Sequence, residues 1–236
     1  TVMFSSVQRK CISMLLELTP EECESVIPVV PTRLQYAAYW SDALKSTGRI
    51  ITAILVGVAL LVLSRAFGEG SFLGAIAFLV GILSLLYPFL WGPLYTISRR
   101  QLAFREIPYG GLFFGQVLRT RRYEVVVEER EKLDEDGNFY IEEVRERQFE
   151  MEIGDETGVV YRVRAKDDPR YRRIVKKQSV LGLVKAYSRD LQRRPTLSEV
   201  YVVKLGEWVG DVSYLDREAF LDMADELLEL QAQGQA

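Results

Sequence analysis

Two strongly apolar stretches, separated by five residues, constrain this chain more than any other feature. Residues 50–66 read IITAILVGVALLVLSRA, with Arg65 as the only charge, and residues 72–91 read FLGAIAFLVGILSLLYPFLW, with no charge. Each stretch approaches the roughly 20 residues that a helix needs to cross about 30 Å of hydrocarbon. The link FGEGS has two glycines and one acid, as a tight turn would. The sequence therefore predicts a hairpin of two transmembrane helices.

The alternative is a buried helical hairpin inside a large soluble protein. The chain has 236 residues, 48% of them hydrophobic and 27% charged. These averages hide a very apolar block beside a very charged one, and little apolar mass remains elsewhere to enclose two such helices. We therefore predict a membrane protein in three parts: amphipathic helices over residues 1–48, the transmembrane hairpin over 49–98, and a soluble domain over 99–236.

Flanking residues predict the orientation of the hairpin. Only one basic residue, Arg65, lies near the turn between the two stretches. The outer ends of the stretches are flanked by Lys45, Arg49, Arg99, Arg100 and Arg105. Lysine and arginine mark the cytoplasmic side of short membrane loops, so both chain ends are predicted to face the cytoplasm or the equivalent stroma. Aromatic residues on the same side are typical of an interfacial belt; these are Tyr39, Trp40, Tyr87, Trp91 and Tyr95.

Small residues within the stretches have two interpretations. They could let the two helices approach each other closely, or they could receive a helix of a partner. We favour mutual packing of the hairpin. The residues concerned are Gly57, Ala59, Gly74, Ala77 and Gly81.

The segment before the hairpin suggests amphipathic helices. Within residues 1–30, apolar side chains recur at helical spacing; they are Val7, Cys11, Met14, Leu15 and Leu18. Residues 33–45 combine an apolar side with an aromatic pair, as an interfacial helix would.

After Ser98, short alternating segments predict a mainly antiparallel sheet. Expected strands cover residues 112–118, 123–129, 139–144, 200–203 and 207–210, with a turn at 135–138 and a helical or irregular segment at 178–191. In the clearest β-hairpin, Met151 would face Tyr161, Phe149 would face Val163, and Glu150 would face Arg162.

A helix over residues 213–231 is expected to follow, starting at a capping-box-like Ser213 and Asp216. Its apolar stripe would pack on the sheet. The soluble domain is thus an α+β or small β-barrel-like domain that ends in a helix.

The sequence offers little for catalysis. It contains no histidine, no phosphate-binding glycine motif and no G-x-S-x-G. Its many carboxylates fall on strands that keep an apolar face, so a charged outer surface is the simpler interpretation. The formal net charge of −3 does not favour nucleic acid. We predict no enzyme activity, no metal, no cofactor and no small-molecule substrate.

The order of several segments resembles a known family. They are the exit YPFLWGPLYTISRR, then YGGLFFGQVL, the turn GDETG, and EVYVVKLGEWVGDVSYLDREAF near the end. This order is similar to that of two-span membrane proteins of cyanobacteria and chloroplasts, some of which carry an automatic phosphate transporter permease label. The resemblance implies residence in the thylakoid membrane and a role in photosystem assembly, stability or acclimation. It implies no catalytic residue.

The resulting hypothesis is a non-enzymatic accessory protein that binds a photosystem complex, most simply photosystem II, within the lipid bilayer. Candidate partner contacts lie where the second stretch leaves the membrane, at Tyr87, Trp91, Tyr95, Arg99 and Arg100. Two alternatives stay open: an accessory subunit of a transporter, and a membrane-anchored ligand-binding or signalling domain.

Overall fold

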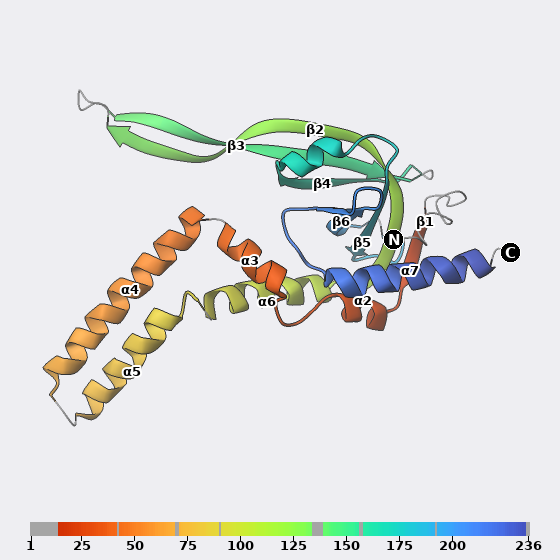
Figure 1. The fold of residues 1–236 in the computed structure, drawn as a ribbon. Helices are drawn as coiled ribbons and strands as arrows, with labels where there is room; N and C mark the ends of the chain where they lie inside the picture. Colours follow the sequence, from red (N-terminus) through yellow and green to blue (C-terminus); the bar gives the residue numbers. More distant parts are fainter. Residues whose placement is uncertain are drawn as a thin grey trace. The chain divides into compact units, whose positions relative to one another are not determined.

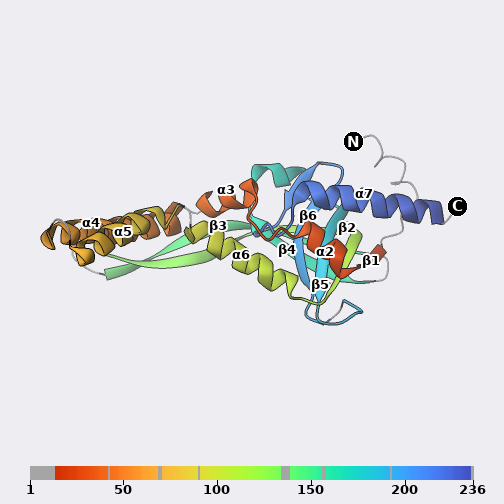
Figure 2. The same cartoon turned by 90° about the horizontal axis from the view of Figure 1, so that it is seen from below.

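The chain divides into two compact units. In the computed structural model, the helical unit is Pro28–Phe104, and the sheet unit combines Thr1–Ile27 with Arg105–Ala236. Figures 1 and 2 show their elements. The structure describes residues 14–41, 43–68, 71–89, 91–133, 139–155, 158–191 and 193–234.

Two long helices dominate the helical unit. Helix α4 (Ala43–Ala66) and helix α5 (Phe72–Leu86) lie side by side in both views and form the helical hairpin (Figures 1 and 2). Helix α3 (Arg33–Ser41) precedes them, and α6 (Trp91–Arg105) follows. The apolar stretches therefore form two adjacent helices, as predicted.

The two helices differ in length. Among the described residues, only α4 is long and apolar enough to cross a membrane, over Thr47–Ala66. Helix α5 has 15 residues, which corresponds to about 22 Å at 1.5 Å per residue. It stops before Pro88, and a turn over residues 87–89 precedes α6, because proline cannot continue the hydrogen-bonded ladder. The second stretch is thus a shorter helix than residues 72–91 suggested.

Small residues let α4 and α5 approach closely. Gly57, Gly74, Ala77 and Gly81 are buried. A Cβ atom added to Gly81 would lie 3.1 Å from Leu61 Cγ and 3.2 Å from the Gly57 carbonyl oxygen. The predicted mutual packing is therefore confirmed at these positions. Ala59 was wrongly included, because it faces outward.

The sheet unit is antiparallel throughout. Its described strands are β1 (Met14–Leu18), β2 (Tyr109–Leu133), β3 (Phe139–Gly154), β4 (Val160–Lys166), β5 (Ser179–Ala186), β6 (Thr196–Val202) and β7 (Glu207–Val209). They are ordered β4-β3-β2-β5-β6-β7, and β1 pairs with β2. Short helices α2 (Pro20–Val26) and η1 (Pro169–Arg173) and the C-terminal α7 (Arg217–Gly234) complete it. The predicted antiparallel sheet with a C-terminal helix is confirmed.

Apolar side chains fill both sides of the central strands. One cluster includes Phe113, Phe149, Met151 and Tyr161, and the Phe113 and Tyr161 rings meet edge to face at 5.0 Å. Strand β5 is buried on both faces. On α7, Phe220 and Ala224 are fully buried, and the Phe220 ring lies 5.8 Å from that of Trp208. The helix therefore packs through its apolar stripe, as the sequence predicted.

Several local predictions were wrong. Residues Met14–Leu18 form a strand on β2 rather than a helical face, and Val7 and Cys11 lie outside the described residues. The segment 178–191 contains strand β5 rather than a helix. Strands predicted at 112–118 and 123–129 are one continuous strand, β2. Helix α7 begins at Arg217, where Asp216 Oδ1 accepts the Glu218 and Ala219 N–H groups, so Ser213 does not cap it.

The β3–β4 register differs from the prediction by two residues. Met151 pairs with Val163, and Ile153 pairs with Tyr161. The predicted faces remain correct because a shift of two residues preserves the side on which each side chain lies. Cross-strand ion pairs also form with shifted partners, Arg162 with Glu152 at 3.2 Å and Arg164 with Glu150 at 3.0 Å.

Strands β2 and β3 continue beyond the rest of the sheet as a two-stranded ribbon (Figures 1 and 2). In this ribbon, residues 124–133 of β2 pair with residues 139–147 of β3. Strand β5 pairs with β2 only before residue 124, and β4 pairs with β3 only after residue 147. Lys132 and Glu142 form an ion pair at 2.6 Å, and Phe139 near the end of the ribbon is 75% exposed. The predicted turn at 135–138 lies outside the described residues.

Replacing Gly81 with leucine should weaken the helical hairpin. The larger side chain would press against Leu61 and the Gly57 carbonyl, and such overpacking costs about 1–3 kcal/mol. We expect a lower thermal unfolding midpoint for the full chain in neutral detergent. Ala59→Leu adds a similar side chain on the outward face of α4 and should leave the midpoint unchanged. Equal losses in the two variants would contradict the glycine packing.

Candidate functional site

Aromatic side chains of α3 meet the segment between α5 and α6. The Trp40 ring stacks on Phe89 at 5.7 Å and meets Tyr39 edge to face at 5.6 Å. The Tyr36 hydroxyl donates a hydrogen bond to the Phe89 carbonyl at 2.6 Å. We call these four residues the aromatic junction. Because α3 precedes the helical hairpin and Phe89 follows it, the junction joins the two ends of the hairpin.

Arg49 of α4 contacts this junction. Its guanidinium lies over the Tyr39 ring, 5.4 Å from the centroid, and donates a hydrogen bond to the Tyr39 hydroxyl. Within the described part of the chain, no carboxylate forms an ion pair with Arg49. A guanidinium has five N–H donors, so several remain available for an anion.

The predicted partner-contact residues lie on or next to α6. Tyr87 and Tyr95 are 51% and 53% exposed. Arg99 lies over the Tyr95 ring at 5.7 Å, and Arg100 is exposed. Trp91 opens α6, but its side chain lies outside the described residues. The structure thus brings Tyr95 and Arg99 together and exposes four of the five predicted side chains.

Sequence reasoning missed part of the junction. Tyr36, Tyr39 and Trp40 have the i, i+3, i+4 spacing of one helical face, a signal that could have added Tyr36. No local pattern marked Phe89, because its contact with Trp40 spans about fifty residues. Also missed was a buried amide pair in the same unit, in which Gln101 Nε2 donates to Gln35 Oε1 at 2.7 Å.

The outer surface of the helical hairpin is apolar and uncovered. Only 11% of the most apolar window of α4 is buried, whereas a core helix of a soluble protein would be mostly buried. Soluble monomers rarely expose continuous apolar patches larger than a few hundred Å². Exposed side chains include Ile51, Leu55, Val62, Phe72, Leu73, Phe78, Leu79 and Leu83.

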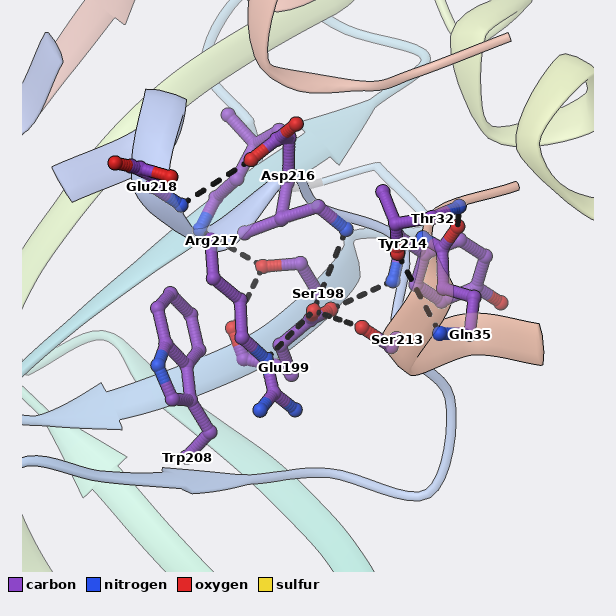
Figure 3. A network of polar contacts seen from close by, with 12 residues as sticks. Thr32, Gln35, Ser198, Glu199, Trp208, Ser213, Tyr214, Asp216, Arg217 and Glu218 are labelled. Atoms are coloured by element: carbon purple, nitrogen blue, oxygen red, sulfur yellow. Dashed lines mark hydrogen bonds and ion pairs between the residues drawn. The ribbon is translucent and has the colours of Figure 1, made fainter. Parts of the chain in front are cut away.

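A buried carboxylate organises the start of α7 in the sheet unit (Figure 3). Glu199 of β6 is 2% exposed and accepts hydrogen bonds from the Ser213 hydroxyl at 2.6 Å and from the Tyr214 N–H at 2.7 Å. The Leu215 N–H is 3.3 Å from the same carboxylate, and Arg217 Nε is 4.0 Å away. Glu199 therefore satisfies the backbone of the loop that leads into α7.

Burial raises the pKa of Glu199, and hydrogen bonds to the carboxylate, the largest from Ser213, oppose that rise. The guanidinium of Arg217 also stacks over Trp208 at 5.1 Å, and the Asp216 N–H donates to the Val26 carbonyl of α2 at 2.9 Å. The hydrogen bonds to the Glu199 carboxylate come from the loop that leads into α7, so this network has a structural role.

A family profile covers nearly all of the chain. Residues 16–233 match a family of unknown function, DUF8619. The chain belongs to this family. No curated protein and no solved structure gives a significant match.

In this DUF8619 member, the buried Lys185 also has a structural contact. Lys185 donates to the Arg105 carbonyl at 3.0 Å, and burial lowers the pKa of its ammonium group. Burial raises the pKa of the neighbouring Cys23 thiol. Within the described ranges, no group of three or more metal-ligating side chains comes together.

The Glu199 carboxyl should make stability depend on pH. An unfolded glutamate titrates near 4.5, and the folded group titrates higher, so the unfolded state loses its proton first as the pH rises. The free energy of unfolding of the wild-type chain should therefore fall relative to Glu199→Gln between pH 4.5 and the raised pKa, and then level off. Unfolding of the full chain in neutral detergent, followed by tryptophan fluorescence, measures this difference.

Glu226→Gln is the matched control because Glu226 is exposed on α7; it should follow the wild-type curve. A wild-type chain that gains stability relative to Glu199→Gln over the same pH range would show that the hydrogen bonds outweigh desolvation.

Proposed function

We propose that this DUF8619 protein is an integral membrane protein whose helical hairpin enters the bilayer and whose sheet unit lies in the cytoplasm or stroma. The single observation that carries the proposal is the uncovered apolar surface of α4 and α5. Hydrocarbon can cover such a surface without leaving polar groups unpaired, since the backbone of both helices is hydrogen-bonded internally.

The aromatic and basic residues that flank the hairpin support its proposed insertion in the bilayer. The aromatic junction and Arg49 lie at the end of the hairpin where α4 begins and α5 ends, and amphipathic aromatic rings are enriched at membrane interfaces. Helix α5 is short for a span, so in this proposal the turn after it and the junction extend the hairpin into the headgroup region. A short apolar helix can also be accommodated by local bilayer thinning.

The proposed role is that of a non-enzymatic accessory protein that binds a larger membrane complex. Tyr95 and Arg99 form an exposed aromatic and cationic pair next to the hairpin, a residue combination that is enriched at protein interfaces. The contacts of the buried Glu199 and Lys185 side chains are structural. The resemblance to two-span thylakoid proteins makes photosystem II the first complex to test.

Membrane insertion predicts retention under alkaline washing. The full chain in native membranes should stay in the pellet after sodium carbonate treatment, because lipid-covered helices do not depend on charge for attachment. Protease protection of epitope tags should place both termini on the same side. Release of the protein by carbonate, or termini on opposite sides, would refute the two-span arrangement.

If Tyr95 and Arg99 contact a partner complex, removing both side chains should weaken binding to that complex. Affinity purification from solubilised thylakoids should recover photosystem subunits at defined stoichiometry, and the double variant Tyr95→Ala, Arg99→Ala should lower that recovery severalfold while the protein stays membrane-bound. Arg65→Gln, near the turn of the hairpin, is the control and should behave like wild type. Recovery of the protein alone would argue against the accessory role, and co-purification of a many-span permease would favour a transporter subunit.

A further inference from the structure

A groove runs along the helical hairpin at the end that carries Arg49. It has a volume of about 500 Å³ and is lined mainly by Gly48, Arg49, Thr52, Ala53, Ser84 and Tyr87. This volume falls within the range of small-molecule sites, roughly 300–1,000 Å³. A Cβ built on Gly48 meets no atom within 4 Å apart from its chain neighbours and the backbone of its own helix, so the absence of a side chain there leaves this part of the groove open.

The walls of the groove are less polar than their residue types suggest. The Thr52 hydroxyl donates to the Gly48 carbonyl at 3.0 Å, and the Ser84 hydroxyl donates to the Ala53 carbonyl at 3.3 Å. Both hydroxyl protons are thereby used within the hairpin. The hydrogen-bond donors that face a ligand are concentrated at one end, on the Arg49 guanidinium and the half-exposed Tyr87.

Charge in this unit is strongly one-sided. Between residues 28 and 104 the sequence has six basic residues and two acidic ones, although the whole chain is acidic. Only one of the six basic residues, Arg65, lies near the turn of the hairpin. The other five precede the first apolar stretch or follow the second; they are Arg33, Lys45, Arg49, Arg99 and Arg100. The end of the hairpin that holds the groove is therefore complementary to an anionic surface.

We propose that this groove binds an anionic lipid, with an acyl chain against Ala53 and Val56 and the headgroup phosphate at Arg49. The site combines an apolar channel with a guanidinium at one end, which matches the two halves of such a lipid. Arg49 is pre-oriented by its stacking on Tyr39 and by the hydrogen bond to the Tyr39 hydroxyl. Its remaining N–H groups can donate to phosphate oxygens as charge-assisted hydrogen bonds.

A lipid fits this groove better than a partner helix does. An apolar helix in the groove would bury the Arg49 guanidinium without a carboxylate, and an unpaired buried charge is strongly unfavourable. A lipid supplies the counter-charge and the hydrocarbon together. This inference rests on the proposed membrane insertion and adds a specific ligand to it.

The test is lipid retention by the purified full chain. Protein in neutral detergent is titrated with phosphatidylglycerol or phosphatidylcholine, and bound lipid is counted by native mass spectrometry. We expect wild type to retain phosphatidylglycerol about fivefold better than phosphatidylcholine, the effect of one basic residue at an anionic headgroup. Arg49→Gln should abolish this preference, whereas Arg65→Gln, at the opposite end of the hairpin, should keep it.

A second variant tests the channel without changing charge. Gly48→Leu places a side chain in the open end of the groove and should lower retention of both lipids severalfold. No preference in wild type, or equal losses in Arg49→Gln and Arg65→Gln, would overturn the lipid site. Carbonate washing of the same protein in vesicles separates the two proposals: a retained protein without lipid preference leaves insertion intact, and a released protein removes both.

Discussion

The apolar outer surface of α4 and α5 is the constraint on which the interpretation of this protein depends. The two helices bury small residues against each other, with Leu61 and Leu85 packed beside the glycines, and most of their other large side chains are exposed. Burial of apolar surface stabilises a protein by about 25 cal/mol per Å², and this surface gains none of that within its own unit. In the proposed function, hydrocarbon covers this surface. The aromatic junction closes the same hairpin at the end where polar groups begin.

The sheet unit is built around β2. This strand pairs with β1, β3 and β5, so segments far apart in the sequence are held to one strand. Cores on both faces of β2 and β5 then require covering elements. The Glu199 network supplies one of them, because it fixes the loop from which α7 starts. A buried carboxylate is acceptable there because each oxygen receives hydrogen bonds.

The sequence predicted a strand or helix well where one face of that strand or helix is exposed to solvent. The alternation of Phe149, Met151 and Ile153 with glutamates identified a strand and its faces, but not its register, because a shift of two residues preserves the pattern. Strand β5 was missed for the opposite reason. It is buried on both faces, and a short continuous apolar run does not distinguish a buried strand from a helix. The strand Met14–Leu18 was predicted as part of a helix, because a run of only five residues fits both the helical period of about 3.6 residues and the strand period of about 2.

The sequence by itself determined the two adjacent apolar helices, the antiparallel sheet and the C-terminal helix, because each depends on local periodicity or composition. Tertiary structure alone decided the strand order, the stacking of Trp40 on Phe89, the Glu199 network and the groove at Arg49. These features join residues that are distant along the chain. Their geometry depends on how whole elements pack, which no local pattern specifies.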